Sequence, residues 1–274
     1  GNKGQVTRWI PGSGYLLLGA LRLATWRGGA GRALWREALH EGHQRLHFRR
    51  QFRAAKAFLD VARAACPVLV VPGNHDVAWW WMPVGLGAQW PMYRGYRKWI
   101  SDDLEPTLQL PGVTIVGLNS CHGVQPYTLT TRLRDVSVVG ALRPAQWTHA
   151  RETFAAAPPT DLKVLVFHHN LLRGDISQRW GLARRAAAIE DALKTGADLV
   201  LNGHDHQTRI DAVEADGRQL VVSATTTLCR RTRGGLPAAF QEIEVDRGQL
   251  RIRSCVWSAA DRDFVARADR VFPR

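Results

Sequence analysis

Three short polar strings, each directly after an apolar run, hold the residues of this chain best suited to chemistry. They are Val-Pro-Gly-Asn-His-Asp ending at Asp76, Val-Phe-His-His-Asn ending at Asn170, and Leu-Asn-Gly-His-Asp-His ending at His206. The apolar runs before them are predicted as strands over Pro67–Val71, Lys163–Phe167 and Asp198–Leu201. Side chains that follow parallel strands gather along one edge of a sheet. An asparagine and several histidines converging there predict a site for divalent metal.

These strings resemble the calcineurin-like metallophosphoesterases, a family of two-metal hydrolases of phosphate monoesters and diesters. The family pattern has five blocks in order: Asp-x-His, Gly-Asp-x-x-Asp, Gly-Asn-His-(Asp/Glu), a His after a strand, and Gly-His-x-His. The last three are present, and the resemblance runs from about Gln51 to about Trp257. It implies a β-sandwich flanked by helices, a binuclear site for divalent metal ions (Mn, Fe or Zn), and a small phosphate ester as substrate.

The resemblance also implies which residues bind metal. Asn74, His168 and His204 would bind the second metal ion, and His206 would reach over to the first. A His-x-His pair suits this task, since alternate residues of an extended segment share a side and a loop can splay them apart. His169 would lie behind the ligands or face the substrate.

Two residues of the first string are implied in catalysis. His75 would lie beside the phosphate as electrostatic stabiliser or general acid, a task that suits imidazole near neutral pH. Asp76 would hold that ring through a hydrogen bond and fix its tautomer. Asp205, between the two histidines of the third string, is expected to face solvent.

The first two family blocks are not recognisable in the chain, since no Asp precedes Asp60. His206 would then be alone at the first metal, and the second site would have only neutral ligands, which hold hard metal ions weakly. Two interpretations stay open. One is a natural homologue that has lost catalysis, and the other is a misread, out-of-frame segment over residues 1 to about 45. A codon argument favours the second interpretation. If the codons possible for His40–Gln44 are read one base later, they can encode the usual start of the family's first strand. Leu46-His47 would then be the in-frame remnant of the Asp-x-His block.

A net charge of +13 on 274 residues raises the possibility of a nucleic-acid or membrane-surface partner. The charge is concentrated at the start, where residues 1–59 contain eleven Lys and Arg against Glu37 and Glu41. We therefore expect no nucleic-acid partner. Tyr15–Leu21 is too short to span a bilayer, which takes about 20 apolar residues, so we expect no membrane association. Four widely spaced cysteines predict free thiols and a cytoplasmic protein.

The expected fold class is α/β in layers, with a mixed sheet and helices outside. Helical spacing over Arg53–Ala65, Arg143–Ala156 and Leu182–Thr195 alternates with strands, and two hairpin patterns follow. Residues 1–50 show neither the helical nor the strand repeat of apolar residues. They are assigned to an anomalous N-terminal segment, in which the family's first strands are missing or aberrant. Residues 51–274 are assigned to one phosphoesterase domain.

The segment Val77–Gln109 is rich in Trp, Pro and Gly and is predicted to be an irregular insertion. Its aromatic residues, among them Trp79, Tyr93 and Tyr96, would either stack on a nucleoside-like leaving group or pack a lid or subunit interface. The predicted function is metal-dependent hydrolysis of phosphate esters, of the phosphodiester type such as cyclic nucleotides or glycerophosphodiesters. The alternative is an inactive homologue that binds a nucleotide or a partner. The sequence leaves the oligomeric state open.

Overall fold

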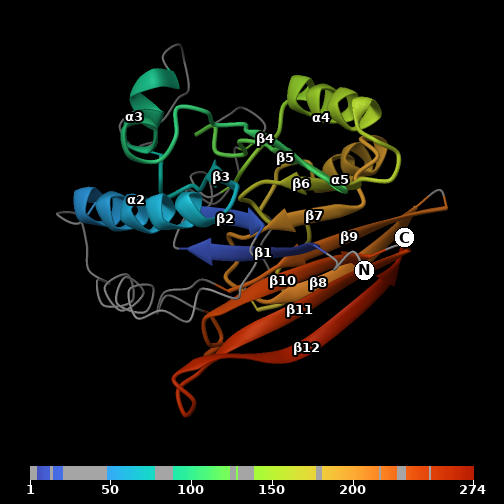
Figure 1. Cartoon of the computed structure of the whole chain (residues 1–274). Coiled ribbons are helices and arrows are strands. Elements are labelled where there is room, and N and C mark those ends of the chain that lie inside the picture. The colour runs from blue at the N-terminus through green and yellow to red at the C-terminus, as the bar shows by residue number, and fades with distance from the viewer. Residues whose placement is uncertain are drawn as a thin grey trace.

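Two six-stranded sheets pack face to face and carry helices on their outer sides (Figure 1). The computed structural model describes residues 5–12, 15–20, 48–77, 89–123, 128, 139–176, 181–215, 217–226, 233–246 and 248–274. The layered α/β fold with a β-sandwich flanked by helices, predicted from the sequence, is confirmed.

The first sheet is antiparallel throughout. Its strands are, in order, β12 (Asp263–Pro273), β11 (Gln249–Ser258), β10 (Ala239–Asp246), β1 (Gln5–Gly12), β2 (Tyr15–Ala20) and β3 (Val68–Pro72). Strands β1 and β2 lie in the segment for which the sequence predicts no regular element. Their backbone groups find partners in β10 and β3, which no local periodicity can reveal. The division of the chain at residue 50 stays a prediction.

The second sheet is mixed and contains the strands that lead to two of the polar strings. Its order is β4 (Thr107–Leu110), β5 (Val113–Gly117), β6 (Leu162–Val166), β7 (Leu199–Asn202), β9 (Arg218–Ala224) and β8 (Arg209–Ala215). Strands β5, β6, β7 and β9 run parallel, and antiparallel β4 and β8 form the two edges. The carboxyl ends of β5, β6 and β7 therefore share one edge of this sheet.

The core between the sheets is built from branched side chains that alternate along the strands. Leu69 and Val71 of β3 meet Ile115, Val164 and Leu201 of the second sheet, and all five are buried. This alternation is what a strand with one face toward a sheet partner requires.

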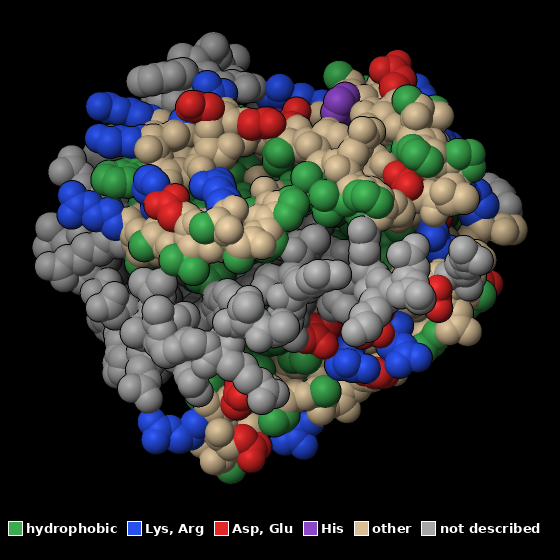
Figure 2. Space-filling model, in the orientation of Figure 1, with side chains coloured by type: hydrophobic (Ala, Val, Ile, Leu, Met, Phe, Trp, Pro, Cys, Tyr) green, Lys and Arg blue, Asp and Glu red, His purple; other side chains and the backbone are tan. Residues whose placement is uncertain are grey.

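Helices cover both outer faces in pairs (Figure 1). They are α2 (Phe48–Ala65), α3 (Gln89–Trp99), α4 (Pro144–Ala156) and α5 (Arg185–Lys194). Phe52 and Leu59 of α2 pack with Tyr96 of α3 on the first sheet. Phe154 of α4 and Ala192 of α5 pack on the second. Lys and Arg side chains are numerous over α2 and α3, with Asp and Glu among them (Figure 2).

The segment predicted as an irregular insertion contains helix α3 and strand β4, so that prediction was wrong over these residues. Tyr93 and Tyr96 are fully buried, and their hydroxyls donate to the carbonyls of Cys121 and Val70. Neither tyrosine is placed to stack on a substrate. Trp79 lies outside the described residues. Across the described part of the chain, no helix is long and apolar enough to cross a membrane.

Candidate metal centre

The three polar strings follow β3, β6 and β7, and they come from both sheets. Asn74 follows β3 of the first sheet, whereas His168 and His204 follow β6 and β7 of the second. The expectation of a single sheet edge was therefore wrong, because β3 pairs with β2 and faces the second sheet across the core. The side chains still meet, since both edges lie at the same end of the sandwich.

Donor atoms of Asn74 and His204 both lie beside one ring nitrogen of His168. His168 Nε2 lies 2.9 Å from Asn74 Oδ1 and 3.1 Å from His204 Nδ1. Ligands bound at 2.0–2.1 Å in a tetrahedral zinc site lie roughly 3.3 Å apart, so this spacing is close to that of a ligand set. Asn74 comes from the first sheet and the two histidines come from the second, so this cluster lies between the ends of the two sheets.

Burial keeps these imidazoles neutral. It lowers the pKa of His168 well below its ordinary value, and the neighbouring His204, His75 and His206 lower it further. Burial likewise lowers the pKa of His204, followed by the effects of His169, His206, Arg233 and His75. An imidazole binds metal in its neutral form, so these lowered pKa values favour metal binding by both rings at neutral pH.

His169 belongs to the same cluster. Nitrogen atoms of His168, His169 and His204 lie within 4.8 Å of one another, and the rings of His169 and His204 have centroids 4.6 Å apart. His169 is only 2% exposed. Its Nδ1 lies 2.8 Å from Ser120 Oγ, and its backbone N–H donates to the same oxygen. An imidazole held this deeply does not face a substrate in solvent.

The Gly-His-Asp-His loop has a strained backbone. His204 and His206 adopt φ angles of +69° and +56°, a region that residues other than glycine rarely occupy. The Asp205 N–H donates to the Gly203 carbonyl at 2.8 Å, which makes His204 the centre of a tight three-residue turn. Such strain is characteristic of functional sites, where the surroundings impose it.

Asp205 is buried, and the expectation that it faces solvent was wrong. Its side chain is 7% exposed, and Oδ1 pairs with Arg233 Nη1 at 3.0 Å. A carboxylate drawn inward needs such a partner. The ion pair with Arg233 therefore anchors the loop at Asp205, which lies between the two histidines that the sequence assigns to metal.

His75 and Asp76 lie in the turn after β3. His75 is half-buried and close enough to His168 and His204 to affect the pKa of both. Asp76 is buried, and its Oδ2 accepts the Gly73 N–H at 2.9 Å, so one carboxylate oxygen closes the turn that presents Asn74 and His75. The role of Asp76 in orienting the His75 ring stays a prediction.

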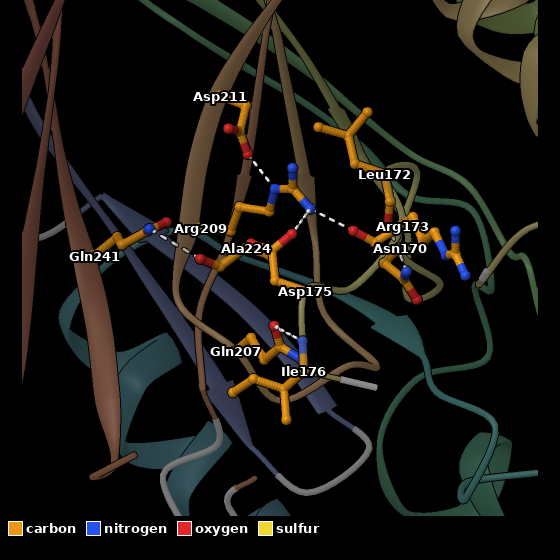
Figure 3. Close-up of polar contacts among 10 residues, drawn as sticks. All are labelled: Asn170, Leu172, Arg173, Asp175, Ile176, Gln207, Arg209, Asp211, Ala224 and Gln241. Atoms are coloured by element: carbon orange, nitrogen blue, oxygen red, sulfur yellow. Dashed lines mark hydrogen bonds and ion pairs between the residues drawn. The ribbon is translucent and has the colours of Figure 1, made fainter. Parts of the chain in front are cut away.

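Polar contacts tie the segment after His169 to the segment after His206, as Figure 3 shows. Gln207 Oε1 accepts the Ile176 N–H at 3.2 Å. Arg209 donates to Asp175 at 3.2 Å and also to Asp211 and the Arg173 carbonyl. The segment after His169 is thus anchored to the start of β8, which directly follows the His-x-His loop.

A fourth loop, after β5, was not assigned to the site from the sequence. It carries Ser120, which contacts His169, and it is held by a buried polar network. Asn119 donates to Tyr93 Oη at 2.8 Å, Gln146 donates to the Asn119 carbonyl at 2.8 Å, and His122 Nε2 lies 3.1 Å from Gln146 Oε1. The sequence feature that could have revealed this loop is the polar string Leu-Asn-Ser, which directly follows β5, a strand parallel to β6.

The residues present fit a metal ion. The donors are one amide oxygen and imidazole nitrogens, and among the described residues no carboxylate joins the His168, His169 and His204 cluster. A nitrogen-rich neutral set suits Zn²⁺ and similar borderline metals better than Mg²⁺ or Ca²⁺. Asn74, His168 and His204 would hold the ion. His206 lies near both of these histidines, as its effect on their pKa values indicates.

Several solved structures are distant likenesses of this chain. Vacuolar Protein Sorting 29 from Cryptosporidium parvum is 16% identical, with 38% of this chain and 50% of that chain covered and a TM-score of 0.25. GAP50, the anchor in the inner membrane complex of Plasmodium, is 10% identical, with 58% and 52% covered and a TM-score of 0.33. A predicted phosphoesterase from Streptococcus pneumoniae TIGR4 is 11% identical, with 47% and 91% covered and a TM-score of 0.26. The match thus spans about half the length of the first two proteins, and TM-scores this low carry no argument about function.

A family comparison is more informative. No curated protein sequence matches the chain significantly. The sequence profile described as calcineurin-like phosphoesterase, however, matches residues 37–208, which is more than half of the chain and includes all three polar strings. The chain belongs to the calcineurin-like phosphoesterase family.

Proposed function

We propose that this chain hydrolyses phosphate esters with a divalent metal ion held by Asn74, His168 and His204. The observation that carries the proposal is the convergence of Asn74 Oδ1, His168 Nε2 and His204 Nδ1, with separations of 2.9 and 3.1 Å from the central nitrogen. Membership of the family supports it, because the family's chemistry is metal-dependent phosphoester hydrolysis.

A metal ion at this point would neutralise charge on a phosphoryl oxygen and lower the pKa of a bound water. The chain's own residues supply the rest. His75, half-buried and close to the triad, would stabilise the phosphoryl group or give a proton to the leaving oxygen. Asp76 keeps His75 and Asn74 in position through the turn that it closes.

Within this reaction we propose phosphodiesters as the substrate class. Monoesters and diesters both release an alkoxide that needs a proton, and His75, a half-buried imidazole close to the triad, would supply it. Small members of the family often hydrolyse cyclic nucleotides or glycerophosphodiesters, and the resemblance leaves the choice between diester and monoester to the experiment.

The test compares bis(p-nitrophenyl) phosphate with p-nitrophenyl phosphate, with Zn²⁺ or Mn²⁺ added or chelated. We expect metal-dependent turnover that favours the diester and falls at least about 100-fold in His204→Ala. His149→Ala, which removes an exposed imidazole on α4, should leave turnover unchanged. Turnover that survives chelation, or that persists in His204→Ala, would refute the proposal.

The alternative is a protein that retains the metal-binding rim but has lost catalysis. One observation favours it: the Asp-x-His and Gly-Asp-x-x-Asp blocks are not recognisable in the sequence. A version of the chain that carries both blocks upstream of α2 distinguishes the two functions. Turnover that appears only in that version would favour the inactive homologue, whereas turnover by the chain as it stands would favour the enzyme.

A further inference from the structure

The strongest unassigned feature of the site is His169, a fourth side chain in a cluster where the family pattern uses three. Its ring has centroids 5.0 Å from His168 and 4.6 Å from His204, and one nitrogen of each ring lies within 4.8 Å of the others. The family pattern assigns this position no metal. In this chain, however, the imidazole is buried against the triad.

We propose that His169 is a further metal ligand, so that this chain binds one metal ion through three imidazoles, His168, His169 and His204, and the amide of Asn74. The inference rests on the metal site of the proposed function but not on hydrolysis. Three nitrogen ligands favour Zn²⁺ over Mn²⁺ and Mg²⁺, which prefer oxygen.

Hydrogen bonding prepares the His169 ring for this role. Ser120 Oγ accepts the backbone N–H of His169 and lies 2.8 Å from Nδ1. A hydroxyl oxygen has two lone pairs, so it can accept the Nδ1–H as well. The lone pair of the imidazole is then on Nε2, the nitrogen left for a metal. Metal-binding histidines generally donate their other ring N–H to such a partner.

Packing holds the same ring in place. A Cβ built on Gly140 would lie 2.0 Å from His169 Nδ1 and 2.2 Å from its Cγ, so the ring rests directly on the glycine backbone. That backbone is fixed by hydrogen bonds with Gly181 and Ala183. The ring is therefore held beside His168 and His204 by packing as well as by hydrogen bonding.

A neutral donor set gains most from a third imidazole. Among the described residues no carboxylate belongs to the cluster, so no anionic ligand strengthens it. Two imidazoles and an amide hold a divalent ion weakly, whereas three imidazoles form a complete protein ligand set for zinc. His169 would therefore add a fourth neutral donor to this set.

The test measures Zn²⁺ affinity by competition with a chromophoric chelator and the visible absorption of bound Co²⁺, which reports the ligands directly. The variants are His169→Ala and His169→Gln, where Gln keeps the size of the side chain, with His149→Ala as a matched control and His204→Ala as a triad variant. We expect both His169 variants to weaken Zn²⁺ binding by at least about 10-fold and to change the Co²⁺ spectrum. His149→Ala should change neither.

The outcomes separate this inference from the proposed function. Wild-type affinity and an unchanged Co²⁺ spectrum in both His169 variants would overturn the inference. Loss of metal in His204→Ala in the same experiment would still support Asn74, His168 and His204 as the metal ligands. Loss of metal in the His169 variants together with no phosphoester turnover in any protein would support the inference and refute the proposed function.

Discussion

Replacing Gly140 by alanine tests whether the His169 ring is held as tightly as the structure indicates. The new Cβ would lie 2.0 to 2.6 Å from three atoms of the ring, and carbon atoms do not approach other groups closer than about 3 Å. Gly140 cannot retreat easily, because its N–H donates to Gly181 at 2.7 Å and its carbonyl accepts from Ala183 at 2.9 Å. The ring must therefore move by about 1 Å or more away from Gly140, which disturbs the 2.8 Å contact between its Nδ1 and Ser120 Oγ.

The cost follows from the two contacts that change. Overpacking a buried site destabilises by about 1–3 kcal/mol, and loss of the Ser120 hydrogen bond adds about 0.5–1.5 kcal/mol. We expect the free energy of unfolding to fall by about 2–4 kcal/mol and the melting temperature by roughly 5–15 °C. Zn²⁺ affinity should fall as well, because the displaced ring borders the triad.

Thermal unfolding and Zn²⁺ competition measure both effects. Gly112→Ala is the control, because Gly112 has a φ of +85° but open space around its Cβ position. It should lose about 1 kcal/mol of stability through backbone strain alone and keep its metal affinity. If Gly140→Ala matched wild type in both stability and metal affinity, the ring would not be held as we describe.

Three further predictions concern other groups of the molecule. His75→Ala should lower turnover by roughly 10²–10⁴-fold while the metal content measured by elemental analysis stays the same; loss of metal together with activity would show that His75 is a ligand instead. Burial lowers the pKa of His122 to about 4. The unfolded chain therefore binds a proton at this residue near pH 6.5, whereas the folded chain binds it only near pH 4. Stability is therefore lost as pH falls from about 6.5 to about 4, by up to about 3 kcal/mol, and urea unfolding should show a loss that is smaller in His122→Gln. Arg233→Ala removes the ion-pair partner of the buried Asp205 carboxylate and should lower stability by about 1–3 kcal/mol and weaken metal binding, whereas Asp205→Asn should cost less; equal stabilities in urea would contradict this.

The strands and the triad could be predicted because their signals are local. An apolar run followed by a polar string marks a strand that ends at a site, and this holds for Val68–Pro72, Leu162–Val166 and Leu199–Asn202. The convergence of Asn74, His168 and His204 then needs only that the three strands end at the same side of the molecule.

Features that depend on distant partners could not be predicted in this way. The sequence does not show that β3 belongs to the other sheet, because that depends on its pairing with β2. Nor does it show that Asp205 turns inward, since its partner Arg233 lies 28 residues away. Ser120 and Gly140 reach His169 from two further loops, and the roles of all three in metal binding stay predictions.

The most direct test of the metal centre is elemental analysis after dialysis, on the wild-type chain and on His204→Ala. The triad of neutral ligands predicts well below two metal ions per chain in wild type and loss of the remaining metal in His204→Ala. Two tightly held ions per chain in wild type, or metal that remains in His204→Ala, would contradict the account, because the ligands would then lie elsewhere.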